Sequence, residues 1–380
     1  MSEVTFPVML QLLRSTVAGV GVLVLAPQPP AAPPRHFETT VLLETTSEDS
    51  ANVSLGDLDG DGDLDIVLAK GRHTPIRDRV LLNDGRGGFV ASDLGPTADR
   101  TYTAALGDLD GDGDLDVVTS NDSPDQKLVF LNDGKGHFTA AGTWGVGAWS
   151  TRNCALADLN ADGRLDVIAA NRPGPSAVCL GAGGGRFASP CIDIPADSTT
   201  TIVPADFDRD GTIDLWVPAR DRGQSYVYLN DGKAGFARRV AFGPADAAGR
   251  AAAVADFDGD GWMDLAFGDE AAASLVVYLN DRKGGLVPGF RMADKARVPY
   301  AMTAGDLNRD GKADIVIGYT AGRPSVFFND GTGRAFADVP FGDGRGWAYG
   351  FAIGDVDRDG WPDVAMARSD APNVLYLSTR

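Results

Sequence analysis

The stretch GDLDGDGDLD occupies Gly56–Asp65, and the same ten letters recur at Gly107–Asp116. Five of its ten residues are aspartates, and carboxylates this close together disfavour one another's ionised form. The stretch is therefore a metal clamp, a solvated acidic turn or part of a catalytic site. Its distribution along the chain helps to decide between these interpretations.

The acidic pattern D-x-[DN]-x-D-G-x-x-D occurs seven times along the chain. Its copies begin at Asp57, Asp108, Asp158, Asp206, Asp256, Asp306 and Asp355. Successive copies start 48 to 51 residues apart, and such a fixed period is the signature of a repeat architecture.

A second motif runs in step with the first. Its copies are LNDGRGGF ending at Phe89, LNDGKGHF at Phe138, LGAGGGRF at Phe187, LNDGKAGF at Phe236, LNDRKGGL at Leu286 and FNDGTGRAF at Phe336. Asn, Asp and Gly tolerate positive φ, so N-D-G favours a hairpin turn. Short β-forming runs such as Ile66–Ala69 and Arg79–Leu82 lie between the two motifs, and no helical periodicity of ten residues interrupts them.

Each repeat therefore predicts four short strands, A to D, with the acidic loop between A and B and the N-D-G turn between C and D. A four-stranded unit of about 50 residues repeated seven times predicts an all-β, seven-bladed β-propeller. We expect residues 35–380 to form this single domain.

The two ends of the repeat array complement each other. The last repeat ends at Leu377, where its N-D-G turn is due, and so lacks strand D. The segment HFETTVLL, which begins at His36, resembles a strand D with Phe37 in the place of Phe89. We expect this N-terminal strand to complete the last blade, which closes the ring and removes an exposed sheet edge.

Composition limits the class of partner. The chain has 380 residues, is 43% hydrophobic and carries a formal net charge of −19. This acidity argues against nucleic acid as the main partner, because phosphate binding needs clustered Lys and Arg. The three cysteines are too few for a disulfide scaffold; Cys179 and Cys191 are close enough to pair, and the absence of a C-x-x-C motif makes zinc a poor expectation.

The N-terminus differs from the repeats. After Arg14, the apolar run Val17–Ala26 is too short to span a bilayer but suits the core of a signal peptide. We expect residues 1–26 to be a signal peptide and residues 27–34 a Pro/Ala-rich linker, which predicts a secreted or cell-surface protein without a transmembrane span. The alternative is an apolar tail before a stiff linker.

The acidic loops have the pattern of a hard-cation site. Oxygen-bearing residues fall at positions 1, 3, 5 and 9, and position 6 is Gly in all seven copies, which suits Ca²⁺. Position 7 varies, which is typical of a position that contributes only its backbone carbonyl. The candidate ligands are Asp57, Asp59, Asp61, Asp63 and Asp65; Asp108, Asp110, Asp112, Asp114 and Asp116; Asp158, Asn160, Asp162, Arg164 and Asp166; Asp206, Asp208, Asp210, Thr212 and Asp214; Asp256, Asp258, Asp260, Trp262 and Asp264; Asp306, Asn308, Asp310, Lys312 and Asp314; and Asp355, Asp357, Asp359, Trp361 and Asp363.

An EF-hand is the obvious competitor, but it needs flanking helices and a Glu at position 12. Position 12 is Leu68 in the first copy and Thr119 in the second. GDLDGDGDLDIVLA and GDLNRDGKADIVIG instead resemble the FG-GAP (VCBS-type) repeats of the integrin α-subunit propeller. That resemblance implies up to seven structural Ca²⁺ ions in the A–B loops on one face of the disc. The alternative is acidic turns kept for solubility.

Function is then expected on the opposite face, where strand A begins. The residues six places before each first aspartate are Ala51, Tyr102, Arg152, Thr200, Arg250, Tyr300 and Tyr349. The B–C loops add basic residues such as Lys70 and Arg368. The candidate ligand-binding residues are Arg72, His73, Tyr102, Arg152, Arg250, Tyr300, Trp347 and Tyr349. Aromatic planes beside Arg donors suit sugars or acidic ligands.

Three functions fit these features. The first is an exported recognition module, lectin-like or adhesion-like, for a carbohydrate or an extracellular protein. The repeat pattern is similar to that of the calcium-bearing mushroom lectin propellers. The second is a polysaccharide-active enzyme, a lyase or a hydrolase, with His73 as its best proton-transfer group; no nucleophile motif such as G-x-S-x-G occurs. The third is a scaffold for assembly at the cell surface.

Overall fold

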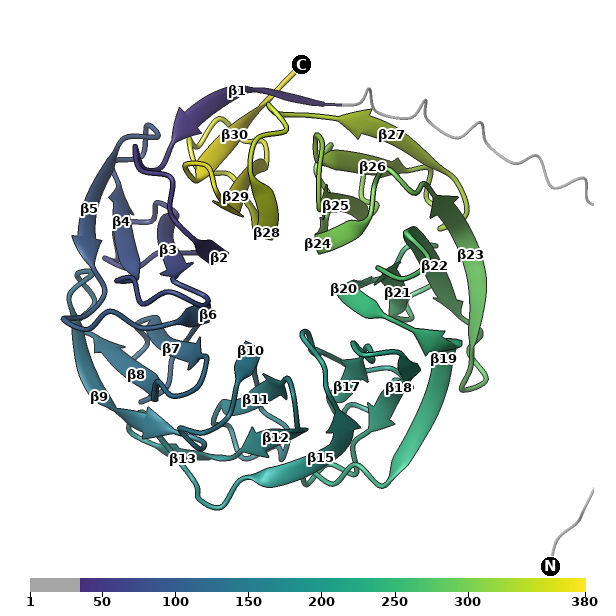
Figure 1. Cartoon of the computed structure of the whole chain (residues 1–380), viewed down its shortest axis with the longest axis horizontal. Helices are drawn as coiled ribbons and strands as arrows, with labels where there is room; N and C mark the ends of the chain where they lie inside the picture. Colours follow the sequence, from purple (N-terminus) through teal and green to yellow (C-terminus); the bar gives the residue numbers. More distant parts are fainter. Residues whose placement is uncertain (1–34) are drawn as a thin grey trace, which may run out of the picture. The chain divides into compact units, whose positions relative to one another are not determined.

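The computed structural model describes residues 35–380, which form thirty strands and no helix. The expected signal peptide and linker lie outside the described residues. The strands make seven four-stranded antiparallel sheets arranged in a ring (Figure 1), so the predicted seven-bladed propeller is confirmed. The described part of the chain contains no helix long and apolar enough to cross a membrane.

Each blade runs from a first strand at the centre of the ring to a last strand at its rim, as β2 and β5 show in Figure 1. The first blade consists of β2 (Ser50–Gly56), β3 (Asp65–Lys70), β4 (Arg79–Asn83) and β5 (Phe89–Asp93). The second consists of β6 (Thr101–Gly107), β7 (Asp116–Asn121), β8 (Lys127–Asn132) and β9 (Phe138–Trp144). The third consists of β10 (Thr151–Ala157), β11 (Asp166–Asn171), β12 (Pro175–Cys179) and β15 (Ile192–Asp197).

The remaining blades follow the same order. The fourth consists of β16 (Val203–Ala205), β17 (Asp214–Val217), β18 (Gly223–Leu229) and β19 (Arg238–Ala247). The fifth consists of β20 (Gly249–Ala255), β21 (Asp264–Asp269), β22 (Ser274–Asn280) and β23 (Leu286–Ala293). The sixth consists of β24 (Pro299–Gly305), β25 (Asp314–Tyr319), β26 (Ser325–Asn329) and β27 (Phe336–Pro340). The seventh consists of β28 (Trp347–Gly354), β29 (Asp363–Ser369), β30 (Val374–Thr379) and β1 (His36–Leu42).

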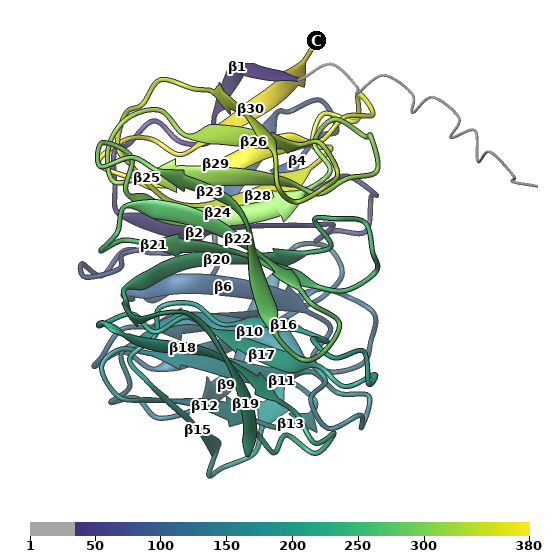
Figure 2. The ribbon, with the colours of Figure 1, turned by 90° about the vertical axis from the view of Figure 1, so that its right-hand side faces the viewer.

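The core lies between neighbouring blades rather than at the centre of the ring. The second strand of every blade is buried at each of its residues. Its apolar side chains, such as Ile66 and Leu68, pack against residues of the adjacent blade, such as Val356 and Ala365. The sheets lie face to face around the ring (Figure 2), and an apolar cluster lies between each pair of neighbouring blades, so each blade buries both of its faces. The outer strands are mostly exposed, as in β5.

The ring closes as predicted. β1 pairs antiparallel with β30, with Thr39 opposite Leu377. Phe37 is fully buried in the cluster between the sixth and seventh blades, and its ring centroid lies 5.7 Å from that of Phe341. The buried side chain of Arg35 donates a 2.9 Å hydrogen bond from Nε to Oγ of Ser378. The first described residues therefore complete the last sheet.

The third blade departs from the repeat. LGAGGGRF forms an extra two-stranded hairpin of β13 (Gly181–Gly183) and β14 (Arg186–Phe187), and the fourth strand of the blade begins only at Ile192. The reason is local, because the stretch lacks the Asn-Asp pair of the other turns and Gly183, Gly184 and Gly185 all adopt positive φ. A disulfide joins Cys179 to Cys191 across this insertion.

Candidate functional site

The seven acidic loops share one hydrogen-bond framework. The first aspartate of each loop accepts a bond from the amide of the position-6 glycine, as Asp57 does from Gly62 at 3.1 Å. The position-5 aspartate accepts one from the position-7 amide, as Asp61 does from Asp63 at 2.8 Å. The glycine is required because position 6 has positive φ, +89° at Gly62. All seven loops are therefore turned in the same way.

The position-9 aspartate holds each loop to its blade. Asp264 is buried and accepts a 2.9 Å bond from the Phe257 amide and a 2.7 Å bond from the Asn280 amide. The same pair of bonds is made by Asp65, Asp116, Asp166, Asp214, Asp314 and Asp363. Burial raises the pKa of Asp264 to about 7. Position 9 thus has a structural role in addition to the metal-ligand role expected of it.

The other carboxylates leave oxygens that point at one another. In five loops, three carboxylates each present an oxygen within 4.8 Å of the others, as do Asp256, Asp258 and Asp260. Buried oxygens without a hydrogen-bond partner occur in the described loops at Asp206 Oδ1, Asp208 Oδ1, Asp258 Oδ1 and Asp355 Oδ1. Burial, together with the charges of Asp260 and Asp256, raises the pKa of Asp258. Unpartnered, mutually repelling oxygens fit a hard cation such as Ca²⁺.

Two of the seven loops differ. In the third loop the side-chain amide of Asn160 donates to Asp162 at 3.2 Å, and Arg164 forms an ion pair with the same carboxylate at 2.6 Å. In the sixth loop Asn308 donates to Asp310 at 3.3 Å, and Lys312 lies 3.3 Å from that carboxylate. The basic position-7 side chain therefore neutralises part of the charge that a cation would meet.

Position 7 also links neighbouring loops, a role that its varied sequence did not suggest. Where position 4 is Arg, its guanidinium reaches position 7 of the next loop. The guanidinium carbon of Arg209 lies 5.6 Å from a ring centroid of Trp262, and Arg309 has the same relation to Trp361 at 5.9 Å. Arg358 forms an ion pair with Asp63 across the closure of the ring.

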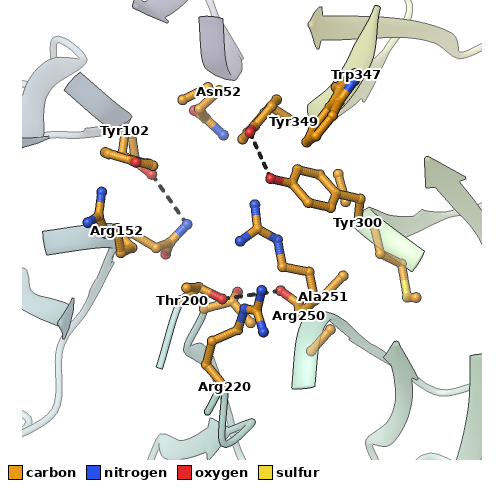
Figure 3. A pocket seen from close by; sticks show the side chains of 18 of the residues that line it. Asn52, Tyr102, Arg152, Thr200, Arg220, Arg250, Ala251, Tyr300, Trp347 and Tyr349 are labelled. Carbon is orange, nitrogen blue, oxygen red and sulfur yellow. Dashed lines mark hydrogen bonds between the residues drawn. The ribbon is translucent and has the colours of Figure 1, made fainter. Parts of the chain in front are cut away.

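The opposite end of the ring has a central cavity of about 380 Å³ (Figure 3). The residues six places before the first aspartate of each loop all line it: Ala51, Tyr102, Arg152, Thr200, Arg250, Tyr300 and Tyr349. In six blades they lie among the first residues of the inner strand, whereas Thr200 precedes β16. His73, Arg172, Arg220 and Glu270 come from the B–C loops. Because Tyr102 precedes Asp108 by six strand residues at roughly 3.3 Å each, the cavity and the acidic loops are on the order of 20 Å apart.

Seven of the eight candidate ligand-binding residues line the cavity. The exception is Arg72, whose guanidinium carbon lies 4.0 Å from the ring centroid of Tyr349 and which forms an ion pair with Asp49 at 2.7 Å. Lys70 and Arg368, expected on this face, are instead buried: Lys70 pairs with Glu44 and Glu48, and Arg368 with Asp343.

Carboxylates compensate most of the arginines at the cavity. Arg152 pairs with Asp122 at 2.8 Å, Arg172 with Asp221 at 2.7 Å, and Arg220 with Glu270. Sequence reasoning counted the arginines and missed these partners, because each carboxylate lies 30 to 50 residues away in another blade. The face is therefore less basic than its arginine content predicts.

The aromatic residues at the cavity are in contact with one another. The Tyr300 hydroxyl donates to the Tyr349 hydroxyl at 2.7 Å, and the two ring centroids are 4.8 Å apart. Trp347 packs edge-on against Tyr300 at 5.7 Å and keeps 45% of its surface exposed. Figure 3 shows the three side chains on one side of the cavity.

His73 lies between two polar partners. Its Nε2 is 3.0 Å from the Tyr102 hydroxyl, and its Nδ1 is 3.4 Å from an oxygen of Asp122. The guanidinium carbon of Arg152 lies 4.6 Å from the centroid of the Tyr102 ring. The imidazole is 63% exposed, so a ligand entering the cavity can reach it.

Comparison with known proteins identifies the repeat. The FG-GAP-like repeat family matches the chain six times, at residues 57–119, 114–169, 158–217, 215–267, 256–317 and 306–366. No curated protein sequence matches the chain.

Many solved structures are similar to this one, among them a protein complex and a lectin. BBS1N in complex with ARL6DN has a TM-score of 0.62 at 11% identity over 91% of this chain and 96% of that chain. An Agrocybe aegerita lectin that specifically recognises non-reducing terminal N-acetylglucosamine has a TM-score of 0.54 at 21% identity over 77% of this chain and 79% of that one. At these identities the likeness shows the fold alone.

Proposed function

The chain belongs to the FG-GAP-like repeat family, and from this membership we propose that it is an exported recognition module that Ca²⁺ stabilises. The acidic loops hold the ions on one face. The cavity at the other end of the ring receives a carbohydrate or protein ligand. We assign the ions to one face and the ligand to the other because the inner strands carry different residues at their two ends.

The support for Ca²⁺ is the set of unpartnered oxygens. In the fourth loop Asp206 and Asp208 each have a buried oxygen without a partner, and Asp210 brings a third carboxylate within 4.8 Å. A bound Ca²⁺ would offset the repulsion between these carboxylates and hold the turn in its folded shape. Because the unfolded chain lacks this arrangement, the binding free energy would add to the stability of the fold.

The observation that carries the recognition proposal is the convergence on one cavity. Every blade contributes residues from the start of its inner strand or, in the fourth blade, from just before it, and these include three tyrosines and two arginines. A concave site with aromatic planes and a few directed polar groups is typical of ligand pockets, which measure roughly 300–1,000 Å³. Propellers of similar fold are known with a carbohydrate ligand and with a protein partner, which supports both ligand classes here.

A ligand screen of the Ca²⁺-loaded protein tests the proposal. We expect a glycan array or a pulldown from extracellular proteins to give a ligand whose binding falls when Tyr300 or Tyr349 is replaced by Ala. The same substitutions should leave the melting temperature in Ca²⁺ high enough for a folded protein at assay temperature. Silence in both screens, or binding unaffected by both substitutions, would contradict the proposal.

The contacts of His73 support a second candidate, a polysaccharide lyase. A lyase must neutralise a uronate carboxylate and move a proton, and His73, Tyr102 and Arg152 are placed together for such roles. Incubation with uronate polymers should then release unsaturated products, and His73→Ala should abolish them. No product from a panel of uronate polymers would leave recognition as the function.

A further inference from the structure

Arg250 differs from the other arginines of the cavity. Within residues 35–380, its guanidinium has no carboxylate partner and donates no hydrogen bond, whereas Arg152, Arg172 and Arg220 each have an ion pair. Figure 3 shows the Arg250 side chain extending into the cavity between Tyr300 and Arg220. A half-buried guanidinium with five unused N–H donors is a ready partner for an anion.

Aromatic contacts hold this guanidinium in place. Its carbon lies 3.8 Å from the ring centroid of Tyr300 and 5.8 Å from that of Tyr349. Stacking on a ring face leaves the N–H groups at the edge of the guanidinium plane free to bind a ligand. Since the Tyr300 hydroxyl is itself bonded to Tyr349, the stack is ordered before any ligand arrives, which lowers the entropy cost of binding.

The surrounding charges favour an anion further. Burial lowers the pKa of Arg220, and the positive charges of Arg250 and Arg172 lower it more. The three guanidinium groups, which all belong to residues lining the cavity, therefore repel one another despite the Glu270 partner of Arg220. An anion at Arg250 would relieve this repulsion.

We propose that the cavity binds the carboxylate of an acidic sugar, such as a terminal uronic acid, through a bidentate contact with Arg250. The inference rests on the proposed ligand-binding role of this face and names its ligand class. A planar carboxylate matches two parallel N–H donors of a guanidinium, which a sugar hydroxyl does not.

A sugar ring fits the rest of the cavity better than an acidic peptide. Trp347 presents a half-exposed aromatic plane next to Tyr300, which suits the apolar face of a pyranose. Asn52, Asn153 and Thr200 line the same cavity and offer both donors and acceptors for hydroxyl groups. The cavity of about 380 Å³ lies near the lower limit for ligand pockets, which suits one terminal sugar.

Calorimetry with a matched pair of probes tests the proposal. Methyl β-D-glucuronide and methyl β-D-glucoside differ only in a carboxylate against a hydroxymethyl group. We expect the full chain in Ca²⁺ to bind the glucuronide at least tenfold more tightly, and to lose affinity for it as salt increases. Arg250→Gln should weaken glucuronide binding about tenfold to a hundredfold, the usual effect of losing a charge-assisted hydrogen bond.

Arg239 supplies the matched control. Its guanidinium carbon lies 4.1 Å from the ring centroid of Tyr226 and it does not line the central cavity. Arg239→Gln removes an equivalent Arg–Tyr stack and should leave glucuronide binding unchanged. Melting temperatures of both variants in Ca²⁺ show whether each is folded.

The possible results separate this inference from the function on which it rests. Equal affinity for the two probes, no binding of either, or an Arg250→Gln variant that binds like the wild type would overturn it. So would a tetraglutamate peptide that binds at Arg250 where the glucuronide does not. A ligand from the glycan array that both wild type and Arg250→Gln retain would leave the recognition function intact and refute only the acidic-sugar site.

Discussion

The side-chain amide of Asn280 donates a 2.9 Å hydrogen bond to the carbonyl oxygen of Phe207, 73 residues earlier in the chain. Phe207 is position 2 of the acidic loop in the preceding blade, so this bond joins two blades. Equivalent bonds are made by the Asn of four other N-D motifs, Asn83, Asn132, Asn230 and Asn329. The Asn-Asp motif therefore closes a hairpin and also connects neighbouring blades.

Replacing Asn280 by Ala should lower the free energy of unfolding by roughly 1–3 kcal/mol, because the Phe207 carbonyl is left buried without its donor. Asp281 is the control: it accepts only local bonds from Lys283 and Gly285 within the exposed turn, so Asp281→Ala should cost less. Denaturant unfolding of both variants measures the difference. Equal losses would mean that the motif acts only as a turn.

Phe37 anchors the strand that closes the ring. Its side chain is fully buried against Phe341, and Phe→Ala changes in such sites typically cost about 3–5 kcal/mol. We expect Phe37→Ala to be strongly destabilising, and deletion of residues 35–44 to expose the edge of β30 and cause association of chains. Leu42→Ala is the control, because Leu42 lies on the same strand with 57% of its surface exposed. A deletion variant that stays monomeric and melts like the wild type would contradict this role.

The fold could be predicted because its information is local and repeated. Every repeat has a glycine at position 6, as in Gly62, and alternating Asp or Asn residues before it. The same prediction could therefore be made independently for each blade. The position six residues before Asp108 located Tyr102 at the cavity by the same logic, since equivalent residues of equivalent strands meet at the same level of the ring.

The interactions that sequence reasoning missed are those between blades. The partner of Arg152 is Asp122 in the preceding blade, and nothing in either local sequence specifies that pairing. The same holds for the second role of Asn280. The third blade shows that motif length alone does not predict the turn. The Gly-rich stretch before Phe187 has the length of the other turns but lacks their Asn-Asp pair, and the chain forms an additional hairpin there.

Asp208→Ala should lower the melting temperature in Ca²⁺ but not in chelator. The Oδ1 atom of Asp208 is buried and has no hydrogen-bond partner, so in chelator Asp208→Ala removes a repelling charge and should not lower the melting temperature. In Ca²⁺ the same substitution removes a ligand and should lower it, because an occupied site adds about 2.7 kcal/mol at a hundredfold excess over Kd. A wild-type melting temperature unmoved by chelator would refute the metal assignment.

The third loop should bind Ca²⁺ more weakly than the fourth. Position 3 is Asn160 in the third loop and Asp208 in the fourth. In the third loop, Arg164 also forms an ion pair with Asp162 and offsets its charge. The double variant Asn160→Asp, Arg164→Thr gives this loop the residues of the fourth at positions 1, 3, 5, 7 and 9. Calorimetric titration should then show one more tight site than in the wild type, while the reverse pair of changes in the fourth loop should remove one. An unchanged number of tight sites in both variants would contradict the assignment.

We expect the stability of the fold to depend on pH through Asp78, which lies outside the acidic loops. It lies in the β3–β4 loop and accepts bonds from the Lys70 amide and the Thr101 hydroxyl, yet burial raises its pKa from 3.8 to about 7. The folded state therefore binds this proton more tightly than the unfolded state. The stability that the proton provides is complete below pH 4 and is lost as the pH rises through 7.

Asp78→Asn isolates this effect. The amide oxygen can still accept from Lys70 and the amide nitrogen can donate to the Thr101 hydroxyl, but the side chain no longer titrates. Between pH 5 and pH 8 in constant Ca²⁺, the free energy of unfolding of the wild type should fall relative to that of the variant by a few kcal/mol at most. Parallel stability curves for the two proteins would show that Asp78 is ionised in the folded state across the whole interval.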